Sequence, residues 1–194
     1  MYTSPAGVAV ADMVAIGKSA LGGGVHTTGA NGAVAIGTDS LTALTSGASN
    51  IAIGYTTLKS LTTGSNNTAV GHEALYTSVD GSSNTAIGRK ALYTFEAGAD
   101  AGENTAVGSL ASFSLTTGTG NASIGKSSMA NATTASNNVA IGLASMGLGV
   151  VTGSENVGIG KDSMYDATSA SGVVAVGTES AYNITSGSES VAIG

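Results

Sequence analysis

The chain has 194 residues, of which 42% are hydrophobic and 9% are charged, and its formal net charge is −6. It contains no cysteine, which excludes disulfide bonds and thiolate metal sites, and its twelve acidic and six basic residues form no basic cluster that would indicate nucleic-acid binding. No apolar run approaches the roughly 20 residues of a membrane-spanning helix, so we expect no membrane insertion in this segment.

A short motif that ends in glycine recurs along the chain, after a lead-in that we place at residues 1–12. Each copy reads Asn-x-small-(Ile/Val)-Gly-x-x-(Ala/Ser)-(Leu/Met) and is followed by a stretch rich in Thr, Ser and Gly; the copy from Asn67 to Leu75 is the cleanest. Seven of the ten spacings between motif glycines are 17 residues, two are 20 and one is 18. A fixed period of this kind indicates a repeat architecture. The motif glycines are Gly17, Gly37, Gly54, Gly71, Gly88, Gly108, Gly125, Gly142, Gly160, Gly177 and Gly194.

The residues before each motif glycine predict a short strand. They are too few and too rich in β-branched side chains for a helix, and alternation along a strand gives them two faces. The position before the glycine is Ile or Val in every copy, and we expect it to point into the core. A second apolar column stands four residues after the glycine. The predicted core contains Ile36, Ile53, Val70, Ile87, Val107, Ile124, Ile141, Ile159, Leu41, Leu58, Leu75, Leu92, Met129 and Met146.

A period of 17 residues accommodates two short strands and two turns, which make one coil of a narrow parallel β-roll. Gly-x-x predicts one corner and Thr-Ser/Thr-Gly the other, as at Thr62 to Gly64. The asparagine that opens most copies, such as Asn67, would hydrogen-bond from coil to coil. We therefore expect an all-β parallel β-solenoid of about eleven coils over residues 13–194, and we expect the repeats to continue beyond Gly194.

The position between the two apolar residues of each strand is small in every copy. A strand position that faces solvent has no need to remain small, so we expect another backbone to approach closely there, in an interface between copies of the chain along the rod axis. An alternative is that these residues only fit tight corners within one coil. The predicted interface contains Ala35, Ala52, Ala69, Ala86, Ala106, Ala140 and Ala175.

The motif resembles the head repeat of YadA-type trimeric autotransporter adhesins, as in Asn84 to Ala91 and Asn138 to Ser145. The longer 17-residue form, with Thr62 to Gly64 followed by Thr68 to Leu75, is more similar to repeats of phage tail-fibre proteins. The resemblance covers about residues 13–194. It implies left-handed coils and assembly as a homotrimer. No coiled-coil stalk, membrane-anchor barrel or C-terminal maturation domain accompanies the repeats in this sequence, so phage and bacterial-surface origins both stay open.

The sequence contains no set of residues that could form a catalytic site, and we expect no enzymatic activity, cofactor or metal site. Its two histidines, His26 and His72, fall at different repeat positions, and no Ser/His/Asp set at plausible spacing can be proposed. Irregular repeats often carry binding loops, which here span Tyr93 to Glu103 and Gly22 to Asn31. The candidate surface contacts are Tyr93, Phe95, Glu96, Asp100 and His26.

Five aromatic residues share the position that follows the second apolar column, namely Tyr76, Tyr93, Phe113, Tyr165 and Tyr182. We expect them to cover the ends of the core; the alternative is an exposed aromatic line suited to sugar stacking. The resemblance implies an extracellular structural segment of a phage tail fibre, a host-recognition appendage in which it spaces or presents a receptor-binding tip. The alternative is the adhesive head of a bacterial surface adhesin. Either would take a glycan or protein of a host cell surface as its further partner.

Overall fold

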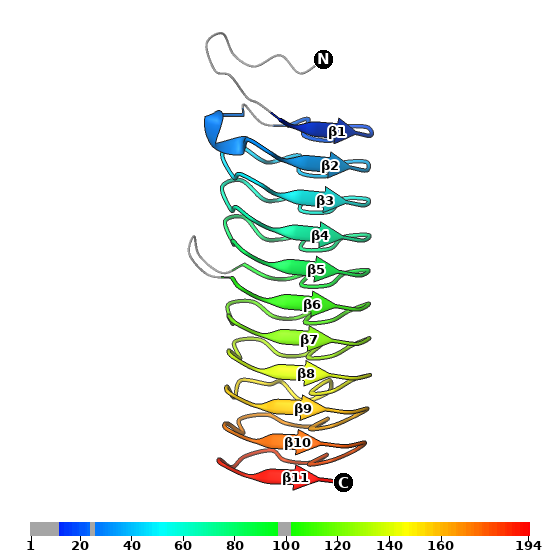
Figure 1. Ribbon diagram of the computed structural model, residues 1–194, viewed down its shortest axis with the longest axis vertical. Coiled ribbons are helices and arrows are strands. Elements are labelled where there is room, and N and C mark those ends of the chain that lie inside the picture. The colour runs from blue at the N-terminus through cyan, green and yellow to red at the C-terminus, as the bar shows by residue number, and fades with distance from the viewer. Residues whose placement is uncertain (1–11, 24–25, 97–101) are drawn as a thin grey trace.

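A computed structural model describes residues 12–23, 26–96 and 102–194, and it is a β-solenoid whose coils stack along one axis (Figure 1). Each coil contains one three-residue strand, and we number the coils by their strands. The described residues contain no α-helix, and none of their helical segments is long and apolar enough to cross a membrane. The elements are β1 (Val14–Ile16), the 3-10 turn η1 (Thr28–Ala30), β2 (Val34–Ile36), β3 (Ile51–Ile53), β4 (Thr68–Val70), β5 (Thr85–Ile87), β6 (Thr105–Val107), β7 (Ala122–Ile124), β8 (Val139–Ile141), β9 (Val157–Ile159), β10 (Val174–Val176) and β11 (Val191–Ile193).

The eleven strands form one parallel sheet in sequence order, so each strand pairs with those of the coils before and after it. The register aligns equivalent motif positions, as in Ala69 with Ala86 and Val70 with Ile87. The sheet confirms the parallel solenoid that the repeat period predicts. The expected second strand in each coil is wrong. Two nearby residues with left-handed backbone, such as Glu73 (φ 56°) and Leu75 (φ 50°), bend that part of the coil too sharply for a strand.

The direction of the side chains in each strand is opposite to the one predicted. The central alanine of the motif, as in Ala86, is 0% exposed and lies inside its own coil. The residue before the glycine, as in Ile87, points outward and is 39% exposed. The interior is too narrow for both Ile and the Leu/Met column: a Cβ added to Gly158, at the alanine position, would lie 3.0 Å from Met146 Cε. The position therefore takes only small residues, which are Ala, Ser or Gly in every coil.

Two of the predicted sets therefore need correction. The expected interface residues Ala35, Ala52, Ala69, Ala86, Ala106, Ala140 and Ala175 are buried within single coils, which agrees better with the alternative of a tight fit inside the coil. The expected core residues Ile36, Ile53, Val70, Ile87, Val107, Ile124, Ile141 and Ile159 are exposed or half-buried on the outer side of the sheet. The second predicted column is confirmed as core: Leu41, Leu58, Leu75, Leu92, Met129 and Met146 are fully buried.

A row of buried asparagines runs through the solenoid, as the sequence predicts. Asn121 Nδ2 donates to Asn104 Oδ1 (3.0 Å) and to the carbonyl of Ala135 (2.8 Å). Its own Oδ1 accepts from the backbone N–H (3.0 Å) and the Nδ2 (3.2 Å) of Asn138. Each amide thus joins its coil to both neighbours, and buried polar groups satisfied in this way stabilise one axial register.

We expect Asn121→Ala to lower the free energy of unfolding by about 2–4 kcal/mol, because it leaves the Ala135 carbonyl and the Asn138 N–H buried without these partners. Urea unfolding followed by circular dichroism measures the change. Asn183→Ala is the matched control: Asn183 is exposed, and its loss should change stability by at most about 0.5 kcal/mol. Equal effects of the two substitutions would contradict a stabilising role for the buried row.

Candidate interaction surface

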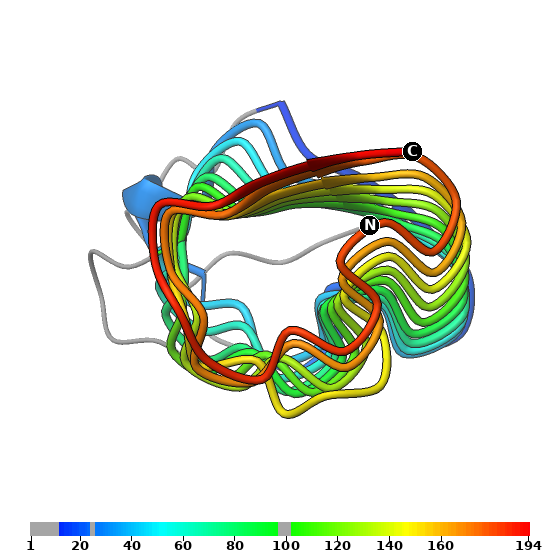
Figure 2. The same cartoon turned by 90° about the horizontal axis from the view of Figure 1, so that it is seen from below.

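The outward side chains of the eleven strands form one continuous apolar surface, which we call the sheet face. Seen down the stack, the strands lie together along one flat side of the solenoid (Figure 2). The position before each motif glycine is Ile or Val in every coil, and neighbouring coils in a sheet lie ~4.8 Å apart. The other outward position is Val or Ile in seven coils and Thr or Ala in β4 to β7. Monomeric proteins rarely expose apolar stripes of this length.

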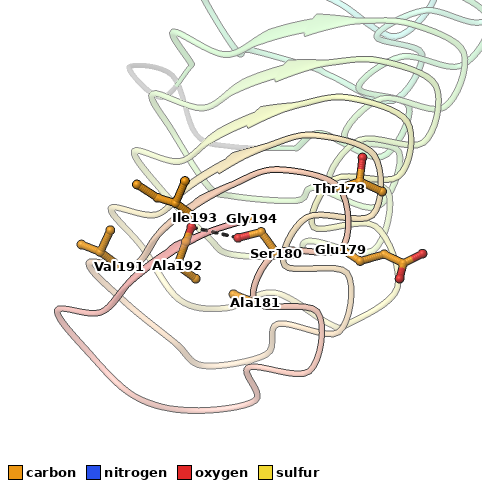
Figure 3. A pocket seen from close by; sticks show the side chains of 8 residues that line it. All are labelled: Thr178, Glu179, Ser180, Ala181, Val191, Ala192, Ile193 and Gly194. Carbon is orange, nitrogen blue, oxygen red and sulfur yellow. Dashed lines mark hydrogen bonds between the residues drawn. The ribbon is translucent and has the colours of Figure 1, made fainter.

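The last coil shows how the strand is held in this orientation (Figure 3). Val191 and Ile193 project away from the coil, whereas Ala192 lies toward the Ser180 side of the interior. The hydroxyl of Ser180 donates to the carbonyl of Ala192 at 2.9 Å. This contact recurs in preceding coils, where Ser163 donates to Ala175 (3.1 Å). In these coils the serine three positions after the glycine therefore holds the central residue of the next strand on the inner side, which leaves the Ile and Val side chains of that strand outside.

The aromatic residues form stacked rows along the side of the solenoid. Tyr93 lies between Tyr76 and Phe113, with ring centroids 5.3 Å apart on both sides, and Lys90 Nζ lies 4.9 Å from its ring centroid. Tyr165 and Tyr182 make a second pair at 5.0 Å. Because stacked rings cover one another's faces, few faces are open to a sugar. The rows join neighbouring coils; four of the five rings are half-buried and Tyr182 is 37% exposed.

The five candidate surface contacts do not come together as one site. Phe95 is fully buried, and a Cβ added to Gly81 would lie 2.9 Å from its ring, so its assignment to the surface is wrong. His26 is also buried, with its Nε2 3.0 Å from the Leu21 carbonyl, and is likewise no surface contact. Glu96 is exposed, Tyr93 is half-buried in the aromatic row, and Asp100 lies outside the described residues.

Sequence reasoning missed a third core column, which Phe95 joins. Fully buried apolar side chains recur three residues after the Leu/Met column, at Leu44, Leu61 and Leu115, and Phe95 stands three residues after Leu92. The spacing Leu-x-x-Leu was therefore visible and would have placed Phe95 inside. Among the described residues no group of three or more His, Asp or Glu side chains is placed to hold a metal ion.

Comparisons of the chain with models of protein families, with curated proteins and with solved structures found no match.

Proposed function

We propose that this chain is a structural segment of a phage tail fibre, assembled as a parallel homotrimer of left-handed solenoids with the three sheet faces turned toward a common axis. The observation that carries the proposal is the sheet face itself. Its Ile/Val column continues through all eleven coils although a single chain leaves it exposed or half-buried. An exposed apolar stripe of that length is explained if other copies cover it.

The dimensions of the sheet face suit a stable interface. The width of the sheet face runs from the residue before the motif asparagine to the residue after the motif glycine. At about 3.3 Å per residue, these six steps give about 20 Å. Eleven coils give a rod on the order of 50 Å long. The product is about 1,000 Å² per copy, compared with about 800 Å² per partner in a standard stable interface. The core of one coil is thin, so burial of this face would add to the stability of the single chain.

A trimeric rod of this kind would serve as a spacer that presents a receptor-binding tip. Each coil adds ~4.8 Å of length, and its backbone and asparagine hydrogen bonds to both neighbours resist bending. The chain would therefore be extracellular, on a virion. Its partners would be its own copies, and the host glycan or protein would be contacted by the tip.

The second candidate, an adhesive head on a bacterial surface, is favoured by one local feature. The spacing between Gly142 and Gly160 is one residue longer than the period, and this loop exposes Leu148 and Val150 away from the sheet face. Exposed apolar side chains on an irregular loop are typical of contact sites. In this role the solenoid itself would bind host surface material.

Two measurements test the proposal. Light scattering of the purified protein should give three times the 18.5 kDa chain mass, and a monomer would contradict the trimer. Electron microscopy with an antibody against the sheet-distal loop at Leu148 should label fibres of the natural virion. Label on a bacterial cell surface instead would overturn the tail-fibre assignment and favour the adhesin.

A further inference from the structure

Charged residues of opposite sign line the two edges of the sheet face. We call the position just after the motif glycine the basic rim, and the position just before the motif asparagine or its equivalent the acidic rim. Four of the chain's six Lys and Arg residues stand at the basic rim, which contains no acid, and four of its twelve acids stand at the acidic rim, which contains no base. The basic rim carries Lys18, Arg89, Lys126 and Lys161; the acidic rim carries Asp12, Glu103, Glu155 and Glu189.

These eight side chains are exposed and are almost entirely without ion pairs in their own chain. In the described part of the chain, the one ion pair that involves any of these eight residues joins Lys161 Nζ to Asp162 at 3.2 Å; His72, which also stands at the basic-rim position, lies 3.5 Å from Glu73. The two rims of one coil lie about 20 Å apart across the strand, well beyond the ~8 Å Debye length at physiological salt. They cannot neutralise each other within one copy.

A second copy can bring the rims together, and only in one orientation. When solenoids are related by rotation about an axis parallel to the rods, with their sheet faces turned inward, the acidic rim of one copy meets the basic rim of the next. When one rod is inverted, acidic rim meets acidic rim and basic meets basic. Like charges placed opposite one another suppress such an arrangement.

The heights of three of the four acidic-rim residues also agree with an in-register arrangement, whereas Glu189 in coil 11 lies two coils from the nearest base, Lys161. Asp12 and Lys18 belong to coil 1, and Glu155 and Lys161 belong to coil 9. Glu103 in coil 6 lies one coil from Arg89 in coil 5 and one coil from Lys126 in coil 7. One step is only ~4.8 Å, which long side chains span easily.

We propose that the two rims recognise each other between copies of this chain, and that this pairing makes the assembly parallel and in register. The inference rests on the proposed homotypic assembly and adds what orients it. The apolar sheet face supplies the attraction, which is the same in either orientation. The rims supply the difference in free energy between the parallel and the inverted orientation. Charges at an interface commonly give specificity in this way.

The test reverses the basic rim around coil 6 with Arg89→Glu and Lys126→Glu. Both rims are then acidic there, so the association constant of the trimer at 0.15 M salt should fall about a hundredfold, with most of the loss recovered at 1 M salt, where screening shortens to ~3 Å. Adding Glu103→Lys to the same chain should restore assembly at low salt. Lys59→Glu with Thr63→Glu and Thr117→Glu changes the net charge equally away from the rims and should leave assembly unchanged.

Orientation has its own readout because the chain contains no cysteine. Donor and acceptor dyes on Asn183→Cys lie close together in parallel copies, whereas inverted copies separate them by about eight coils, or ~40 Å. High energy transfer is expected in the labelled Asn183→Cys chain with its native rims, and low transfer would overturn the proposal. Unchanged assembly of the reversed-rim variant, or no rescue by Glu103→Lys, would overturn it as well. A wild-type parallel dimer with the same charge effects would keep the rims and contradict the trimer; a wild-type monomer would contradict both.

Discussion

Gly108→Ala is expected to destabilise the solenoid by about 3–5 kcal/mol, a large effect for a single methyl group. Gly108 has a φ of +135°, a region that L-residues rarely adopt and that alone costs about 1–3 kcal/mol. An added Cβ would also lie 2.5 Å from the carbonyl oxygen of Gly125 in the next coil. The neighbouring coil would have to move, and the registered hydrogen bonds beyond it would move too. Urea unfolding monitored by circular dichroism measures the loss.

Gly187→Ala is the matched control for this substitution. Gly187 has a similar φ of +131°, but an added Cβ would meet nothing within 4 Å. Its effect should be limited to the backbone strain, and the difference between the two variants reports the clash between coils. Equal losses would mean that close approach of neighbouring backbones is not what requires glycine at the motif position. No loss at Gly108 would contradict the geometry of the stack itself.

The period of the repeat predicts most of the fold, because equivalent residues of a parallel solenoid must lie above one another. The strand positions, the Leu/Met column and the asparagine row all follow from that one constraint, and the structure confirms them. The second strand of each coil does not follow from it. Residues such as Leu75 adopt left-handed backbone despite having a side chain, and no local sequence signal indicates this.

The direction of the strand side chains could not be read from alternation alone. A three-residue strand such as Thr85–Ile87 has an apolar residue in the middle as well as at one end, so the pattern fits either orientation. The interior volume of the coil decides which of the two side chains points inward. One further sequence signal agrees with the outcome: where the Leu/Met column contains Ser112, the central position contains Ser123, and their hydroxyls lie 2.8 Å apart inside the solenoid. Compensating polar residues of this kind show that the two columns share one interior.

The double substitution Ile87→Lys and Ile124→Lys is expected to abolish assembly and leave the single solenoid folded. Both side chains lie on the sheet face and are 39% and 41% exposed in one chain, so a single copy loses little by the change. In a trimer they would occupy six buried sites, where each isoleucine would bury its remaining exposed surface, worth about 0.6–1.2 kcal/mol, and an unpaired ammonium is strongly disfavoured. Light scattering should therefore give the 18.5 kDa mass of one chain, with a wild-type circular dichroism spectrum.

Leu148→Lys with Val150→Lys makes the same kind of change at exposed apolar side chains away from the sheet face and should leave the trimer intact. The comparison separates a specific interface from a general effect of added charge. If the sheet-face variant kept the assembly mass of the wild type, the copies would not meet through this face. If it unfolded as a single chain, the Ile/Val column would be part of the coil's own core, as the alternation in the sequence had indicated. Only loss of assembly with the fold retained would support the conclusion that the outward Ile/Val column joins copies of the chain.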